Sequence, residues 1–303
     1  MASLTPRSTA PFSLAQAAES GTNAGAVSGL GLGAGTPAAK SASRPSAFDV
    51  WVDGVSSYFS NDSATGRSEG QTAMMHTGAD YVVVPGLLIG VMGQMDWTSQ
   101  SSSSLLQNSD GAGWMAGPYM SARLTRNLYF DTRAAWGQST GHIDPLGSFT
   151  DTYSTSRALA SAKLTGDWSW NDFRFRPSAE VVYYSETQQA YTNALGIGIG
   201  AQSVSLGRTI FGPEIGYRMR LENNSTFEPF IGFKGIWDFS ATQDTTAAGA
   251  PNGHDGLRGR IEGGANWSTQ SGISFRGSGS YDGLGSGSYH AVQGQAAIVV
   301  PLQ

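Results

Sequence analysis

From Phe48 onward, apolar and polar residues alternate in segments of about a dozen residues that turn signals separate. In residues 257–267, apolar or small residues occupy the odd positions, and polar residues such as Arg258 and Glu262 occupy most of the even ones. Successive side chains of a strand point to opposite faces. Such a segment therefore has one apolar face and one charged face, and we expect an all-β protein built from strands of this kind.

The composition favours a membrane barrel over a soluble sheet. Charged residues make up 14% of the chain, well below the quarter that is usual in soluble proteins. No run of about 18 apolar residues is present, which excludes a transmembrane helix. We therefore expect a transmembrane antiparallel up-and-down β-barrel with lipid outside and a polar lumen inside. A soluble β-sandwich is the alternative, but it seldom needs such long strands.

Turn signals divide this region into about twelve strands. We expect them at residues 48–60, 69–84, 87–98, 112–124, 127–140, 150–168, 172–186, 201–220, 226–239, 255–268, 272–282 and 288–301. Tight turns such as Pro85-Gly86 alternate with longer polar stretches, which we expect to be loops at residues 99–110, 141–148, 187–200 and 240–254. Short turns at one end and long loops at the other are typical of bacterial outer-membrane barrels, and an even strand number places both termini at the short-turn, periplasmic end.

Residues 1–47 differ from the rest of the chain because Ala, Gly, Ser, Thr and Pro dominate them. Such a segment cannot bury enough apolar surface to fold alone. We expect two parts: a flexible, low-complexity linker or pore segment at 1–47, and an outer-membrane barrel at 48–303. Residues 13–26 could form a short helix if they are confined in a pore. The glycine-rich run 29–35 lacks the flanking strand and helix of a phosphate-binding loop.

The charged faces of the strands supply the residues that we expect to line the pore. Acidic and basic side chains are mixed among them, so the lumen would hold a polar segment loosely. The expected pore-lining residues are Asp96, Arg123, Asp131, Arg133, Arg157, Lys163, Arg174, Arg176, Glu180, Arg208, Glu214, Arg218, Arg220, Glu228, Lys234, Asp238, Arg258, Arg260, Glu262 and Arg276. Trp51 also falls on the polar side of its strand, whose pattern is less regular.

Aromatic residues cluster near the strand ends, where an amphipathic ring would lie at the level of the lipid headgroups. We expect two such bands around the barrel. The expected girdle residues are Tyr81, Trp97, Trp114, Trp136, Trp168, Phe173, Phe227, Trp237, Trp267 and Tyr281.

The sequence gives little support for catalysis or for a cofactor. The chain has no cysteine, and its net charge of -5 with no basic run argues against nucleic-acid binding. His142 and His254 fall in expected loops near Asp144 and Asp255, but no GxSxG or HExxH motif accompanies them. We expect no enzymatic activity, no cofactor and no metal site.

Four stretches carry a family resemblance: Phe48-Asp-Val-Trp-Val-Asp-Gly54, Gly78-Ala-Asp-Tyr81, Phe211-Gly-Pro-Glu-Ile-Gly-Tyr217 and Phe227-Glu-Pro-Phe-Ile-Gly232. With their order and spacing, residues 48–303 resemble the carboxy-terminal translocator of type V autotransporters. The resemblance implies a twelve-stranded barrel in the outer membrane of a Gram-negative bacterium. It also implies assembly by the barrel assembly machinery, a linker that threads the pore, often as a helix, and export of an N-terminal passenger to the cell surface.

Some members of that family cut their linker within an Asn-Asn pair, whereas the linker here contains only Asn23. We therefore expect no self-cleavage by that route. We expect a monomer whose partners are outer-membrane lipid, the assembly machinery and its own passenger or linker.

Two other functions fit the same fold. A stand-alone porin would have an open lumen, with a loop such as 240–254 folded into it. A surface adhesin or receptor would bind a partner through the loops 99–110 and 187–200.

Overall fold

The computed structural model describes residues 48–63, 66–102, 107–145, 149–222, 224–243, 257–287 and 289–302. Within these ranges, no helix is long and apolar enough to cross a bilayer. The predicted linker or pore segment 1–47, with its possible helix at 13–26, lies outside the described residues, as do His254 and most of the loop 240–254.

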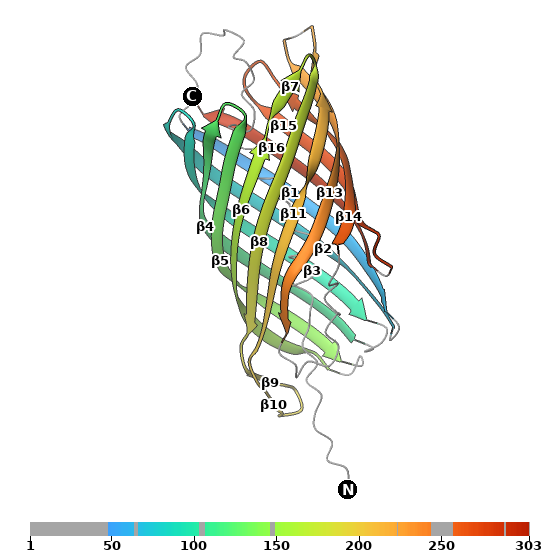
Figure 1. The fold of residues 1–303 in the computed structure, drawn as a ribbon. Helices are drawn as coiled ribbons and strands as arrows, with labels where there is room; N and C mark the ends of the chain where they lie inside the picture. The colour runs from blue at the N-terminus through green and yellow to red at the C-terminus, as the bar shows by residue number, and fades with distance from the viewer. Residues whose placement is uncertain are drawn as a thin grey trace.

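Twelve long antiparallel strands form one closed sheet, which confirms the predicted up-and-down barrel (Figure 1). The long strands are β1 (Phe48–Ser63), β2 (Gly66–Val84), β3 (Leu87–Ser102), β4 (Gln107–Thr125), β5 (Leu128–Pro145), β6 (Asp151–Gly166), β8 (Phe173–Gln188), β11 (Gln202–Tyr217), β13 (Thr226–Gln243), β14 (Leu257–Ser268), β15 (Ser274–Leu284) and β16 (Tyr289–Leu302). Four short strands, β7 (Trp168–Trp170), β9 (Tyr191–Thr192), β10 (Gly198–Ile199) and β12 (Met219–Arg220), lie in the connections between them.

The first and last strands close the ring. β1 pairs with β16 along a ladder that runs from Phe48 opposite Leu302 to Asn61 opposite Tyr289. On its other side, Phe48 lies opposite Tyr81, close to the Pro85-Gly86 turn. Both ends of the barrel sequence therefore lie at the end that carries the short turns.

The strands slant across the barrel, so ladder partners do not lie at one height (Figure 1). Arg157 on β6 lies opposite Gly137 on β5. Gly137 in turn lies opposite Met115 on β4, and Met115 lies opposite Gln94 on β3. A long side chain can cross these steps and contact a residue several strands away.

The two faces of the sheet differ sharply. Charged residues are buried on the inner face, where Arg208 is 0% exposed and Asp53 is 1% exposed. Large apolar residues lie exposed on the outer face, as Phe233 at 51% and Ile231 at 44% illustrate. This distribution of charged and apolar residues is the reverse of that found in soluble proteins, and it suits a barrel whose outer surface contacts lipid.

The strands extend beyond their predicted ends. Much of the predicted loops 99–110 and 141–148 belongs to β3, β4 and β5, because the β3–β4 ladder continues to Ser102 opposite Gln107. Backbone hydrogen bonds continue a ladder even where polar side chains occupy both faces, so side-chain alternation underestimates strand length. The predicted strand 150–168 ends at Gly166, and the predicted loop 187–200 contains the β9–β10 hairpin.

Candidate functional site: the barrel interior

Inward-facing glycines make room for large side chains along the inner wall. A Cβ atom would lie 2.5 Å from the ring of Trp51 if added at Gly78, and 2.4 Å from the ring of Tyr119 if added at Gly90. Each ring therefore occupies the space above a glycine on a neighbouring strand. This packing keeps bulky groups close to the wall rather than across the lumen.

A chain of hydrogen bonds ties β1, β4 and β2 together. Trp51 Nε1 donates to Tyr119 Oη over 2.7 Å, and Tyr119 Oη donates to Asp80 Oδ2 over 2.7 Å. The two rings meet edge to face, with their centroids 6.0 Å apart. Trp51 thus lies on the inner face, as the period of its strand indicates, and its indole N–H is satisfied there.

A chain of alternating charges crosses β11, β13, β14 and β15 on the inner wall. Arg208 Nε donates to Asp238 over 2.5 Å, and Arg258 Nη1 reaches the same carboxylate over 2.7 Å. Arg258 also donates to Asp282 over 3.2 Å, and Arg260 donates to Asp282 over 2.8 Å. Each carboxylate thus lies between two guanidinium groups, which compensates the cost of burying these charges.

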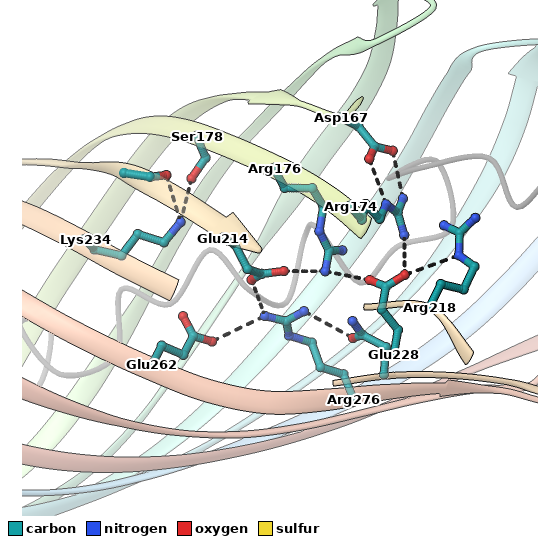
Figure 2. A network of polar contacts seen from close by, with 12 residues as sticks. Asp167, Arg174, Arg176, Ser178, Glu214, Arg218, Glu228, Lys234, Glu262 and Arg276 are labelled. Atoms are coloured by element: carbon teal, nitrogen blue, oxygen red, sulfur yellow. Dashed lines mark hydrogen bonds and ion pairs between the residues drawn. The ribbon is translucent and has the colours of Figure 1, made fainter. Parts of the chain in front are cut away.

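A second network lies toward the short-turn end, where side chains from β8, β11, β13, β14 and β15 converge (Figure 2). The Glu228 carboxylate accepts hydrogen bonds from Arg174 over 3.3 Å, Arg176 over 3.0 Å and Arg218 over 3.4 Å. Arg174 also donates two hydrogen bonds of 2.7 Å to Asp167. Glu228 is therefore the shared acceptor of three arginines.

The same network continues through Arg276 on β15. Its Nη2 donates to Glu214 over 3.0 Å and to Glu262 over 3.3 Å (Figure 2). Glu214 also pairs with Arg176, which joins this part to the group around Glu228. Lys234, in contrast, donates to neutral acceptors, the Ser178 hydroxyl and the backbone carbonyl of Gly212.

Two buried charges at the middle of the wall have unsatisfied atoms. Arg133 and Glu180 are each 4% exposed and interact electrostatically with one another. Among the residues that the structure describes, Arg133 Nε and Glu180 Oε1 have no hydrogen-bond partner, and other side-chain atoms of the inner wall share this condition. Buried polar atoms without partners are uncommon in folded proteins. A further polar group could therefore accept a hydrogen bond from Arg133 Nε or donate one to Glu180 Oε1.

The structure places most of the sequence-predicted pore residues on the inner face. Buried are Asp96, Asp131, Arg133, Arg157, Arg174, Glu180, Arg208, Glu214, Glu228, Asp238, Arg258 and Arg260. Half-buried are Lys163, Arg176, Arg218, Lys234, Glu262 and Arg276. Arg123 and Arg220 are exposed near the short turns, where Arg123 donates to the carbonyls of Thr125 and Arg126.

Sequence reasoning missed several inner residues. Asp53, His76, Asp80, Glu186 and Asp282 are all buried. The signal that could have found them is the strand period itself, because Asp53 shares the parity of Trp51, and His76 shares that of Asp80.

The predicted girdle residues lie on the outer face. Eight of them are exposed: Tyr81, Trp97, Trp114, Trp136, Trp168, Phe173, Trp237 and Trp267. Phe227 and Tyr281 are half-buried. Two of these tryptophans contact a neighbouring ring: Trp237 lies 5.8 Å from Phe239 and Trp267 lies 5.4 Å from Phe275, measured between ring centroids.

Within the part of the chain that the structure describes, no group of three or more His, Asp or Glu side chains is arranged to hold a metal ion. The half-buried His142 contacts Thr152, with Nδ1 and Oγ1 3.0 Å apart.

Solved structures of similar fold include three autotransporter barrels. The β-domain of the Bordetella autotransporter BrkA matches with a TM-score of 0.67 and 18% identity over 84% of this chain and 100% of that one. The translocator domain of NalP from Neisseria meningitidis matches with a TM-score of 0.65 and 12% identity over 96% and 99%. The transport unit of AIDA-I from Escherichia coli matches with a TM-score of 0.59 and 15% identity over 90% and 95%.

These likenesses show a shared fold, whereas the family itself is shown by a sequence model. Comparison with curated protein sequences gives no significant match. The model of the Autotransporter beta-domain matches residues 50–281, which is most of the barrel, and confirms the resemblance predicted from the sequence. The chain therefore belongs to the autotransporter β-domain family, and it forms an outer-membrane translocator barrel of a Gram-negative bacterium.

Proposed function

We propose that the barrel interior carries the chain's own N-terminal passenger toward the cell surface, and that residues about 10–47 then occupy the lumen. The main support is the arrangement of charges on the inner wall. Acidic and basic side chains pair with partners on nearby strands of the closed ring. β1 begins at Phe48 at the short-turn end, so the preceding segment joins the barrel at one of its openings. A polar lumen suits a segment rich in small and hydroxyl residues.

The dimensions agree with a single threaded segment. Twelve strands about 4.8 Å apart and tilted by about 40° give a backbone cylinder roughly 24 Å across. Side chains on the inner face reduce the bore to on the order of 10 Å, which matches one α-helix or an extended hairpin. A folded passenger domain would not fit.

The unsatisfied atoms at the middle of the wall give this segment a point of contact. Arg133 Nε is a donor and Glu180 Oε1 is an acceptor, and neither has a partner within the described part of the chain. In our proposal, they bond to the backbone or hydroxyl groups of the threaded segment. Such a contact is sequence-tolerant, as a route for a passing polypeptide requires.

Planar-bilayer conductance tests the location of the segment. A variant without residues 1–47 should conduct much more current than the full chain, whereas removal of residues 1–9 alone should leave the conductance unchanged. Equal conductance of all three proteins would contradict a segment in the lumen. It would favour the stand-alone porin, in which loops set the bore.

Surface display tests export itself. A protease-sensitive reporter peptide fused before residue 1, behind a secretory signal, should become accessible to protease on intact cells. The same reporter joined after residue 303 serves as the control, because β16 ends at the periplasmic side and that reporter should stay protected. A protected N-terminal reporter would contradict export.

We propose further that the assembly machinery inserts the barrel, that its outer face contacts lipid, and that it acts as a monomer without catalysis. The two aromatic bands and the exposed apolar outer face support lipid contact. Export of a threaded chain needs no catalytic group in the wall.

Extracellular binding through the described β9–β10 hairpin is the alternative role of the loops, and its exposed Leu195 is the observation in its favour.

A further inference from the structure

The inner faces of β1, β2 and β3 form an acidic side of the lumen. The carboxylates on these faces are Asp49, Asp53, Asp80 and Asp96. β1 and β3 contain no lysine or arginine. The one arginine of β2, Arg67, lies exposed near the loop end, where it pairs with Asp62 and Glu69. Cations for the inner carboxylates must therefore come from outside these three strands.

Other strands supply a cation to two of the four carboxylates. Arg157 on β6 forms an ion pair with Asp96, and Arg133 on β5 interacts electrostatically with Asp53. Arg123 on β4 lies at the short-turn end, but it donates to two backbone carbonyls at the turn that follows its strand. The inner wall thus brings no arginine to the acidic side at this end.

Asp80, at the short-turn end of β2, has no cationic partner in the described part of the chain. Its Oδ2 accepts a hydrogen bond from the Tyr119 hydroxyl over 2.7 Å, and its Oδ1 has no hydrogen-bond partner there. Asp80 is 2% exposed. Directly opposite on β1 lies Asp49, a second carboxylate that repels it. A buried carboxylate beside a like charge is costly unless a cation joins it.

The sequence just before β1 contains a suitable cation. Arg44 precedes Phe48 by four residues, which span at most about 14 Å. Phe48 lies opposite Tyr81, the residue next to Asp80, so Arg44 is within reach of the Asp80 carboxylate. A guanidinium also matches the two oxygens of a carboxylate and stays charged at any physiological pH.

We propose that Arg44 forms an ion pair with Asp80, and that this pair turns the preceding segment into the lumen. The Asp80 side chain is on the inner face, so a guanidinium that contacts it must approach from inside the barrel. The inference rests on the proposed placement of residues 10–47 in the lumen, and it names the contact that fixes their entry. Lys40, eight residues before Phe48, is the alternative cation.

Planar-bilayer conductance of the full chain tests the role of Arg44. Arg44→Glu should raise the fraction of time spent in the high-conductance state about tenfold, because a charge-assisted pair becomes a repulsion. Arg7→Glu, the same change elsewhere in the segment, should behave as the wild type, and Lys40→Glu should have a smaller effect than Arg44→Glu. An equal or larger effect of Lys40→Glu would overturn the assignment to Arg44.

The variant without residues 1–47 separates this inference from the proposed function. If that variant conducts more current but Arg44→Glu behaves as the wild type, the ion pair is wrong and the segment still occupies the lumen. If removal of the segment leaves the conductance unchanged, both proposals are wrong.

Charge reversal tests the partner. Asp80→Arg alone should open the pore as Arg44→Glu does, and the two changes together should restore the low conductance. Additive effects of the two changes would overturn the pair.

Cross-linking provides a second measurement if Asp80→Arg does not fold, because the chain has no cysteine of its own. A short cross-linker with two thiol-reactive ends should join Arg44→Cys to Asp80→Cys. It should not join Arg44→Cys to Ala79→Cys, the control on the outer face of the same strand. Cross-linking to position 79 alone, or to neither position, would overturn the proposal.

Discussion

The guanidinium of Arg157 on β6 forms a two-pronged ion pair with Asp96 on β3, over 2.8 Å and 2.9 Å. To reach it, the side chain passes over Gly113 on β4, where an added Cβ would lie 2.2 Å from Arg157 Nη2. Arg157 also donates to the backbone carbonyls of Trp114 and Gln138. The ion pair, which spans four strands, therefore depends on the absence of a side chain at Gly113.

Replacing that glycine should weaken the barrel. Gly113→Ala displaces the guanidinium from Asp96, and we expect the free energy of unfolding to fall by about 1–3 kcal/mol. Urea unfolding in lipid vesicles, followed by tryptophan fluorescence, measures the change. Gly93→Ala is the matched control on β3, because nothing lies within 4 Å of its added Cβ. Equal losses in both variants would contradict this account.

Neutralising Glu228 should cost more than neutralising Glu262. Glu228 accepts from Arg174, Arg176 and Arg218, whereas Glu262 accepts from Arg276, which keeps Glu214 as a second partner. Glu228→Gln removes the anion that three guanidinium groups share, and although Arg174 keeps Asp167 and Arg176 keeps Glu214, several charge-assisted hydrogen bonds are lost at once, so we expect a loss of about 2–3 kcal/mol. Glu262→Gln should cost about 1 kcal/mol in the same urea titration. The reverse order would show that the network does not hold the wall in this way.

Tryptophan quenching should separate the outer face from the inner one. Trp136 is 60% exposed on the outer face, and Trp51 is 3% exposed inside. In variants that retain one of these tryptophans, with the others changed to Phe, brominated lipid should quench Trp136 strongly and Trp51 weakly. Comparable quenching would mean that the predicted girdle does not contact lipid.

A charge on the outer face should be costly at mid-height and tolerated near the loops. Ile231 is exposed on the outer face of β13, pairs with Gly263 and lies between the predicted girdle residues Phe227 and Trp237 of the same strand. We expect Ile231→Arg to lower the free energy of unfolding by about 2–4 kcal/mol, because the guanidinium enters hydrocarbon. Ser154→Arg, near the loop end of β6, should change it by less than about 1 kcal/mol. Similar effects at both positions would place the bilayer elsewhere.

Much of the fold could be predicted from local pattern because strand period and face are local properties. Trp51 is the instructive case: its position on a polar face looked irregular, yet the structure places it inward, bonded to Tyr119. The stretches predicted as loops at 99–110 and 141–148 were wrong in large part, because backbone pairing rather than side-chain alternation carries the strands onward.

The partners within the candidate site could not be predicted in the same way. Asp96 and Arg157 were both expected on the charged face, but no sequence signal joins residues 61 positions apart. Their meeting depends on the slant of the strands and on the space above Gly113. His76 was read as one of a few isolated histidines, and only the register of β1, β2 and β3 brings Asp53 and Gln94 to its two nitrogens.

The amino-acid sequence by itself determined that this chain forms strands with one apolar and one charged face, since side-chain direction alternates with every residue. Together with the low content of charged residues, that pattern favoured a closed ring in a membrane over a soluble sandwich. The tertiary structure alone decided which inner charges meet, because ion pairs across several strands depend on register and tilt, which are set only when β16 closes against β1.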